Sequence, residues 1–293
     1  MSARTLKNYY SLTKPGVLYG NAITAAAGFL FAAAVFRTFE PGLFVALCIG
    51  TTLVIASACV INNVLDADID SKMERTKKRV TVTREVPQSR AVLFGITLGI
   101  VGLLILYFYT NLLVVGIGIF GFIDYVALYG MLTKRLSVHG TLVGSISGAM
   151  PILAGYCAVS DRLDAGAILV FLALFFWQMP EFYSISIYRH DEYKAAGVPV
   201  MSVVAGIRST KIQIYIYTVL FVACTLLLTI LGYTGFVYLF VMAALGGYWL
   251  WLAAIGLQVQ SEKTNAWARR MFHFSLIMLL AFSAMLPIGA LLA

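Results

Sequence analysis

The chain has 293 residues, of which 61% are hydrophobic and only 12% charged, and its mean hydropathy is +0.90. These values exclude an ordinary soluble globular protein and indicate an all-α, polytopic membrane protein. We interpret the net charge of +8 as the charge of basic loops beside a lipid bilayer, so no nucleic-acid partner is expected.

Nine apolar runs are long enough to cross a bilayer, because about 20 residues span its hydrocarbon core. The predicted spans cover residues 17–36, 42–65, 91–109, 112–130, 140–158, 166–188, 213–231, 235–256 and 271–292. Basic residues precede the first run as they would in a signal peptide, but the run exceeds the usual apolar core of such a peptide. We therefore expect nine transmembrane helices in a single domain over residues 1–293.

The lysines and arginines lie almost entirely on one side of these spans. Only Arg37 and Arg162 fall in loops on the other side. Since cytoplasmic loops carry the excess of basic residues, the N-terminus and the even-numbered loops are predicted to be cytoplasmic, in a bacterial inner membrane. The four cysteines sit singly in apolar runs and predict neither a disulfide nor a zinc site; they are Cys48, Cys59, Cys157 and Cys224.

The second span ends in the polar segment INNVLDADIDSKMERTKKR. Its Asn62, Asp66 and Asp70 are spaced four residues apart and share one helix face. Ionised residues near hydrocarbon are costly and mark functional sites. Two close carboxylates repel unless a cation joins them, and Mg²⁺ usually shares its ligands with substrate phosphates. The pattern predicts a Mg²⁺-diphosphate site, with a helix end whose acids pair with Arg75 and Lys78 as the alternative.

Basic residues near this segment are candidates for the diphosphate contacts. Arg75, Lys78 and Arg79 are favoured, whereas the other cations of the same loop act equally well as topology determinants. The loop after the fourth span adds Lys134 and Arg135. The following glycines, Gly140, Gly144 and Gly148, recur every four residues and favour close helix packing over substrate contact.

A second polar concentration follows the sixth span, in WQMPEFYSISIYRHDEYKAAGVPV. Glu181 lies about two turns inside the span, which favours a cavity position. Trp177, Gln178 and Tyr188 are candidates for the cavity or an acceptor, although the two aromatic residues also suit an interfacial belt. Lys194 is a further diphosphate candidate. Asp124, in the fourth span, has two possible roles: it belongs to the site, or it pairs with a partner of its own outside the site.

Several of these stretches occur together in one known family. They are TKPGV at 13–17, NNVLDADIDSKMERT at 62–76, KRLSVHGTLVGSISGAMP at 134–151, WQMP at 177–180 and DEYKAAGVPV at 191–200. The chain resembles the protohaem IX farnesyltransferases (haem O synthases) of the intramembrane aromatic prenyltransferase superfamily over nearly its whole length. The Asn-x₃-Asp-x₃-Asp element is typical of the superfamily, and DIDxxMxRT and WQMP are typical of haem O synthases.

The resemblance implies helices around a central cavity open to the cytoplasmic side. It implies Mg²⁺-dependent ionisation of farnesyl diphosphate and attack by a vinyl group of haem b, which is a substrate and not a cofactor. Haem O would then pass to a terminal oxidase or a haem A synthase. Asn62, Asp66 and Asp70 match the family's first metal element, and Asp191 matches the second.

The chain departs from the family at Glu181, where the family usually has His, and at Val80, where it tends to have Pro. Other members of the superfamily carry a carboxylate in the corresponding part of the second motif. The departure at Glu181 motivates a second hypothesis, a prenyltransferase of the same fold with a quinone-precursor aromatic acceptor. A secondary transporter coupled through carboxylates is the alternative from another class, but the acids cluster at one face of the membrane.

Overall fold

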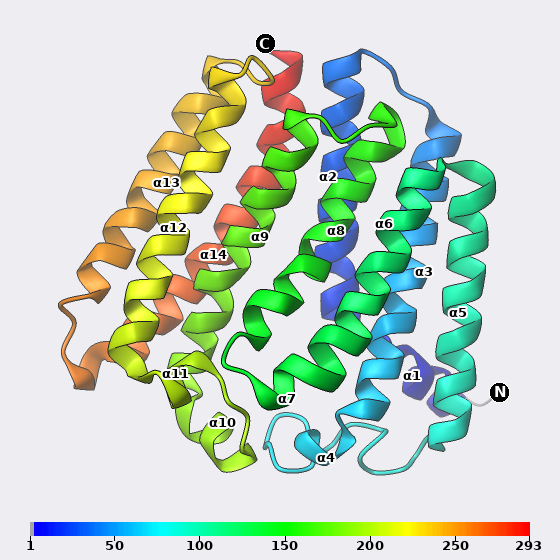
Figure 1. Cartoon of the computed structure of the whole chain (residues 1–293), viewed down its shortest axis with the longest axis vertical. Coiled ribbons are helices and arrows are strands. Elements are labelled where there is room, and N and C mark those ends of the chain that lie inside the picture. The colour runs from blue at the N-terminus through cyan, green and yellow to red at the C-terminus, as the bar shows by residue number, and fades with distance from the viewer. Residues whose placement is uncertain (1–2) are drawn as a thin grey trace.

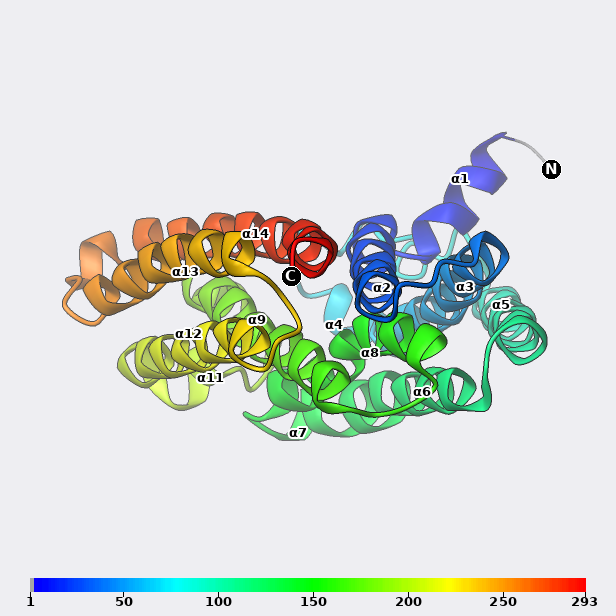
Figure 2. The ribbon, with the colours of Figure 1, turned by 90° about the horizontal axis from the view of Figure 1, so that it is seen from above.

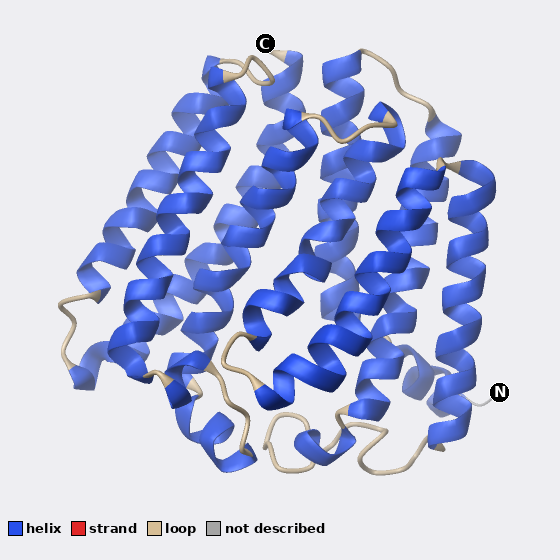
Figure 3. Cartoon of the chain, viewed as in Figure 1, coloured by secondary structure: helices blue, strands red, loops and turns tan. Residues whose placement is uncertain are grey.

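The computed structural model describes residues 3–293, so Met1 and Ser2 of the predicted domain lie outside the described residues. Nine helical spans in this range are long and apolar enough to cross a membrane (Figure 1). They are α2 (Pro15–Phe36), α3 (Pro41–Leu65), α5 (Gln88–Tyr109), the span of α6 (Leu112–Ile123), η1 (Asp124–Thr133) and α7 (Lys134–Leu136), then α8 (Gly140–Ser160), α9 (Ala165–Tyr188), α12 (Gly206–Ile230), α13 (Phe236–Gly256) and α14 (Ser261–Leu291). No strand occurs among the described residues (Figure 3). The prediction of an all-α membrane protein is confirmed.

The remaining helices are short and gather at one end of the bundle, together with the long loop between α4 and α5 (Figure 1). They are α1 (Ala3–Leu12), α4 (Ala67–Asp70), α10 (His190–Ala196) and α11 (Met201–Val204). This end of the bundle carries both polar segments of the sequence, because α4 belongs to the first segment and α10 to the second. The fold therefore brings together two segments that are more than a hundred residues apart.

The long helices form two rows when seen from above (Figure 2). One row holds α13, α14, α2 and α3, and the other holds α12, α9, α8 and α6, with α5 packed against α3 at one end. Contacts between the rows join α2 to α8 and α14 to α9. One large cluster of buried apolar side chains runs through both rows.

Glycines allow α2 and α8 to approach closely. A Cβ added at Gly28 would lie 2.1 Å from the Ile152 carbonyl oxygen, and one at Gly155 would lie 2.1 Å from the Ala25 oxygen. Only a residue without a side chain permits such a backbone approach. The two helices are therefore held at a distance that leaves no room for substitution at either glycine.

The predicted glycine stripe of α8 does pack against other elements. A Cβ at Gly144 would meet the Tyr129 ring at 2.9 Å, and one at Gly148 would meet the Gln178 Oε1 at 2.0 Å. Gly140, Gly144 and Gly148 also line a cavity, so the stripe contributes both to helix packing and to the cavity wall.

Two helices begin well before their predicted spans. α12 begins at Gly206 instead of 213, and α14 begins at Ser261 instead of 271. Their first turns are polar, so hydropathy alone placed them in loops. Lys211 of α12 is 6% exposed and donates to the Val259 carbonyl oxygen at 2.8 Å and to Thr264 Oγ1 at 3.0 Å. These bonds join the start of both helices, and tertiary contacts extend each helix beyond its apolar run.

Candidate active site

The first acidic element lies where α3 ends. Asn62 is in the last turn of α3, Asp66 follows its last residue, and Asp70 is in α4. The backbone bond from Asp66 N–H to the Asn62 oxygen is 2.9 Å, and that from Asp70 N–H to the Asp66 oxygen is 2.8 Å. The four-residue spacing thus keeps a helical repeat through the end of α3, and the three residues are 1%, 1% and 4% exposed.

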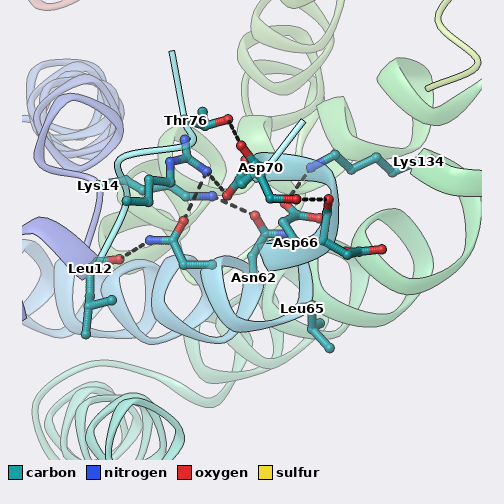
Figure 4. A network of polar contacts seen from close by, with 12 residues as sticks. Leu12, Lys14, Asn62, Leu65, Asp66, Asp70, Thr76 and Lys134 are labelled. Atoms are coloured by element: carbon teal, nitrogen blue, oxygen red, sulfur yellow. Dashed lines mark hydrogen bonds and ion pairs between the residues drawn. The ribbon is translucent and has the colours of Figure 1, made fainter. Parts of the chain in front are cut away.

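Each of these three side chains has a cation as its partner (Figure 4). Lys134 Nζ lies 2.5 Å from Asp66 Oδ2, and Arg79 Nη1 lies 2.5 Å from Asp70 Oδ2. Arg79 also donates to Asn63 Oδ1 at 3.2 Å. Lys14 Nζ donates to Asn62 Oδ1 at 2.6 Å. Two acids and one amide therefore have cations from three different segments as partners, and neither buried carboxylate is left without a compensating charge.

Lys14 was not predicted as a site residue. Its backbone lies in the left-handed region, with φ 53° and ψ 69°, directly before Pro15 at the start of α2. A residue other than glycine held there stores strain of about 1 kcal/mol, and such strain concentrates at functional sites. Burial lowers the pKa of the Lys14 ammonium to about 8. The KPG sequence at the start of the first span was the only signal that could have identified it.

The donor set fits a hard divalent cation that takes further ligands from a substrate. Asp66 Oδ1 and Asn62 Nδ2 are both buried, and neither atom has a hydrogen-bond partner. Within the described part of the chain, no group of three or more His, Cys, Asp or Glu side chains is placed to hold a metal ion, so a cation here would need ligands of other kinds. Two aspartates and one amide supply oxygen ligands, and phosphate oxygens would complete a Mg²⁺ shell.

A cavity of about 540 Å³ extends from this polar cluster into the bundle. Its polar end is lined by Lys14, Asn62, Asp66, Asp70, Arg75, Arg79, Lys134 and Tyr193. Its deeper part is lined mainly by apolar and small residues, among them Leu106, Ile117, Phe122, Met150, Ala154, Leu174 and Leu279. The cavity thus combines a cationic and acidic mouth with an apolar interior, an arrangement suited to an amphiphile with an anionic head.

The predicted diphosphate contacts separate into two groups. Arg75, Arg79 and Lys134 line the cavity. Arg135 does not, because it donates to both oxygens of Asp68 at 2.7 and 2.8 Å and to the Leu65 carbonyl oxygen. The hydrogen bond from Arg135 lowers the pKa of the exposed Asp68 carboxyl to about 2. Lys78 and Lys194 are exposed and are not among the lining residues.

The residues predicted on the sixth span mostly face the cavity. Trp177, Gln178 and Glu181 line it. Trp177 Nε1 donates to the Ser275 oxygen at 2.8 Å, which ties α9 to α14. Tyr188 does not line the cavity. Its ring lies against the guanidinium group of Arg269, whose central carbon is 4.8 Å from the ring centre.

Glu181 differs from every other acid at the cavity. It is half-buried on α9, one residue after Pro180, and faces the cavity. It has neither a hydrogen bond nor an ion pair with any described residue. Gln178, one turn earlier, donates to the oxygens of Ser145 and Leu174 at 3.0 and 3.1 Å. Glu181 is therefore an unpaired carboxyl group in a largely apolar wall.

Two further predicted residues lie away from the mouth. Asp191 of α10 is exposed and is not among the lining residues, whereas Tyr193 of the same short helix is. The structure gives Asp124 a private partner, because its buried Oδ2 accepts the backbone N–H of Ser147 on α8 at 3.0 Å. Asp124 begins the π-helix η1, and this wider winding is frequent near functional sites.

Comparison with known proteins assigns the family. The model of the UbiA prenyltransferase family matches residues 21–276. Protoheme IX farnesyltransferase 2 of Chromobacterium violaceum is 46% identical over 282 residues, which cover 96% of this chain and 92% of that protein. Protoheme IX farnesyltransferase of Chromohalobacter salexigens is 44% identical over 283 residues, which cover 97% of this chain and 95% of that protein.

Solved structures share the fold at low sequence identity. One, from work on digeranylgeranylglyceryl phosphate synthase in membranes, has a TM-score of 0.82 and 19% identity, and the match covers 99% of this chain and 100% of that one. A UbiA homolog from Archaeoglobus fulgidus, bound to GPP and Mg²⁺, has a TM-score of 0.71 and 15% identity, covering 95% and 99%. The match extends across nearly the whole bundle, and the protein is a multi-pass membrane protein. The chain belongs to the UbiA prenyltransferase family.

Proposed function

We propose that this protein transfers the farnesyl group of farnesyl diphosphate to a vinyl group of haem b, giving haem O and diphosphate. The observation that carries the proposal is the cavity with its two ends. Buried Asn62, Asp66 and Asp70 stand with their cations at the mouth, and apolar residues line the interior. The names of the relatives that match nearly the full chain support haem as the acceptor.

The mouth of the cavity would bind the diphosphate. Lys14, Arg79 and Lys134 already line it and donate to the polar side chains of the acidic element. Arg75 lines the same end and is exposed, so it can reach an entering anion without losing a buried partner. Charge-assisted hydrogen bonds of this kind are the stronger ones in proteins.

Asn62, Asp66 and Asp70 would hold Mg²⁺, which is the only cofactor proposed. When bound there, the ion would neutralise charge on the diphosphate leaving group. The A. fulgidus homolog has been solved with Mg²⁺ as well as with Cd²⁺, which supports a divalent cation. A second ligand set at Asp191 stays a proposal, since this residue would have to approach the mouth when substrate binds.

The reaction balances without a nucleophile from the protein. The carbon–oxygen bond of farnesyl diphosphate breaks, and both of its electrons leave with the diphosphate. The π electrons of the haem vinyl group form the new carbon–carbon bond to the farnesyl cation. Water adds to the remaining vinyl carbon and loses one proton, which leaves a hydroxyethylfarnesyl side chain. The cations at the mouth stabilise the leaving group, and the apolar walls keep water away from the farnesyl cation until the carbon–carbon bond has formed.

A quinone-precursor aromatic acceptor is the second candidate, and Glu181 is the observation that favours it. An unpaired carboxyl group on the cavity wall suits a hydrogen bond to a phenolic hydroxyl group better than contact with an apolar porphyrin face. Coupled transport is not proposed, because the acids of the mouth are paired with cations and the chain belongs to a prenyltransferase family.

We further propose that the protein lies in a bacterial inner membrane with its N-terminus and the cavity mouth on the cytoplasmic side. The basic loops gather at the end of the bundle that carries α1, α4 and α10, which supports this orientation. The chain would form one domain, and haem O would pass to a terminal oxidase or a haem A synthase.

The test is an assay of the purified protein with haem b, farnesyl diphosphate and Mg²⁺, with products resolved by mass. A farnesylated haem that is lost in Asp66→Ala and on removal of Mg²⁺ is expected. Transfer to 4-hydroxybenzoate instead of haem would favour the second candidate. Turnover that persists in both Asp66→Ala and Asp70→Ala, with correct membrane insertion, would overturn the metal assignment.

A further inference from the structure

Two apolar side chains form a wall between the cavity and a second hollow. Ile117 of α6 and Met150 of α8 line the cavity, and the same two residues line a separate hollow on the outer side of these helices. That hollow, with a volume of about 340 Å³, is otherwise lined by Leu112, Leu113, Gly116, Phe120, Leu153 and Leu163. Two side chains therefore separate two apolar spaces.

Glycines of α6 leave room for the side chains at and near this wall. A Cβ added at Gly121 would lie 3.1 Å from Met150 Cγ, so the absence of a side chain there gives the methionine its place. One at Gly118 would lie 3.5 Å from Leu106 Cδ1 at the deep end of the cavity. Ile117 is 8% exposed, and α6 packs directly against α8 (Figure 2).

The distance from the mouth of the cavity to the wall is close to the length of a short prenyl chain. Gly140 lies beside Lys134 at the mouth, and Met150 is ten residues further along α8, or about 15 Å at 1.5 Å per residue. At the length per bond of an extended chain, a farnesyl group reaches about 13 Å and a geranylgeranyl group about 18 Å. The first chain ends before the wall, and the second would have to pass it.

We infer that Ile117 and Met150 determine the longest prenyl chain that this protein accepts. The inference rests on the proposed function, because it places the diphosphate at the mouth and the prenyl chain in the cavity. The side chains of both residues block an isoprene unit beyond farnesyl. The outer hollow supplies apolar space for that unit once the wall is opened.

The test is a competition between farnesyl and geranylgeranyl diphosphate, with haem b as acceptor and Mg²⁺ present. The wild-type protein should give mainly the farnesyl product. Met150→Ala should raise the ratio of geranylgeranyl to farnesyl product by about tenfold or more, which is the discrimination that apolar pockets reach per group. Leu113→Ala, which enlarges the outer hollow without opening the wall, should leave the ratio unchanged.

Two further measurements keep the inference open to refutation. If Met150→Ala does not fold, Ile117→Val removes a single methylene from the other wall residue and should shift the ratio in the same direction. Competition binding of the two diphosphates reports on the wall without any acceptor. If the ratio of geranylgeranyl to farnesyl is unchanged in variants that still bind farnesyl diphosphate, the inferred role of Ile117 and Met150 is wrong. If the binding ratio shifts but no haem product forms, only the proposed acceptor is wrong.

Discussion

At the scale of single residues, the site depends on cations that lie far apart in the sequence. Lys14 precedes α2, Arg79 lies in the loop after α4, and Lys134 begins α7. A buried ion pair adds little net stability to a protein. Removal of one partner is nevertheless strongly destabilising, because the other charge is then buried without compensation. We therefore expect Asp66 and Asp70, which are 1% and 4% exposed, to depend on Lys134 and Arg79 for folding.

Lys14→Ala should weaken binding of farnesyl diphosphate. The change removes a charge-assisted contact worth about 1.5–3 kcal/mol, so the KM should rise about tenfold or more with a smaller change in kcat. Steady-state kinetics at fixed haem b and Mg²⁺ measure this. Lys7→Ala, at an exposed position of α1, is the control and should behave like the wild type. Equal KM values for the two variants would exclude Lys14 from the site.

Glu181→Leu should raise the thermal stability of the protein. A buried unpaired polar group costs about 1–3 kcal/mol, and the half-buried Glu181 is expected at the lower end of this range. Its removal should therefore increase the melting temperature by about 2–4 °C, the shift that about 1 kcal/mol gives in a large domain. Gln178→Leu is the contrasting variant, since both hydrogen bonds of that amide are lost and the melting temperature should fall. Thermal unfolding of the two proteins in the same detergent measures both effects. A lower melting temperature for Glu181→Leu would mean that this carboxyl group has a stabilising partner.

At the scale of helices, the contact between α2 and α8 sets the width of the cavity, because both helices line it. Most of the fold at this scale could be predicted from hydropathy, since an apolar run of about 20 residues leaves few alternatives to a spanning helix. The early starts of α12 and α14 could not be predicted in this way. The first turns of these helices are joined by the hydrogen bonds of Lys211 to Val259 and Thr264, which lie in another part of the chain.

Gly155→Ala should destabilise the protein by about 1–3 kcal/mol, the usual cost of overpacking. The new methyl group would lie 2.1 Å from the Ala25 oxygen and 2.8 Å from the Phe29 nitrogen, so the backbone of α2 must shift. Gly247→Ala on α13, where nothing lies within 4 Å, is the matched control and should be neutral or slightly stabilising. Melting temperatures measure the difference, and similar values for both variants would contradict the close packing.

At the scale of the whole molecule, the distribution of charge gives the bundle a direction. The end with α4 and α10 carries the basic loops, and the opposite end carries Arg37 and Arg162. The candidate site lies at the basic end, so its access depends on the orientation of the protein in the membrane.

Single cysteines introduced at Lys78 and Arg162, in a variant whose native cysteines are replaced, should report this orientation. A maleimide that cannot cross the membrane should label the cysteine of Arg162→Cys from the outside of intact cells. The cysteine of Lys78→Cys should react only after the membrane is opened. The reverse pattern would place the mouth on the outer side and contradict the proposed topology.

The sequence by itself determined the fold class and the nine spans, and it predicted the acidic element of the candidate site. Long apolar runs and a four-residue spacing are local properties, and hydrocarbon permits few other structures around them. Its resemblance to one family also identified the chemistry that the relatives' names support.

Tertiary structure alone decided which polar groups meet. It paired Asp66 with Lys134 instead of Arg75 or Lys78, gave Asp124 a backbone partner on α8, and added Lys14 to the mouth. It also placed Ile117 and Met150 between two apolar spaces. These relations join elements that lie apart in the chain, so no local pattern of residues encodes them.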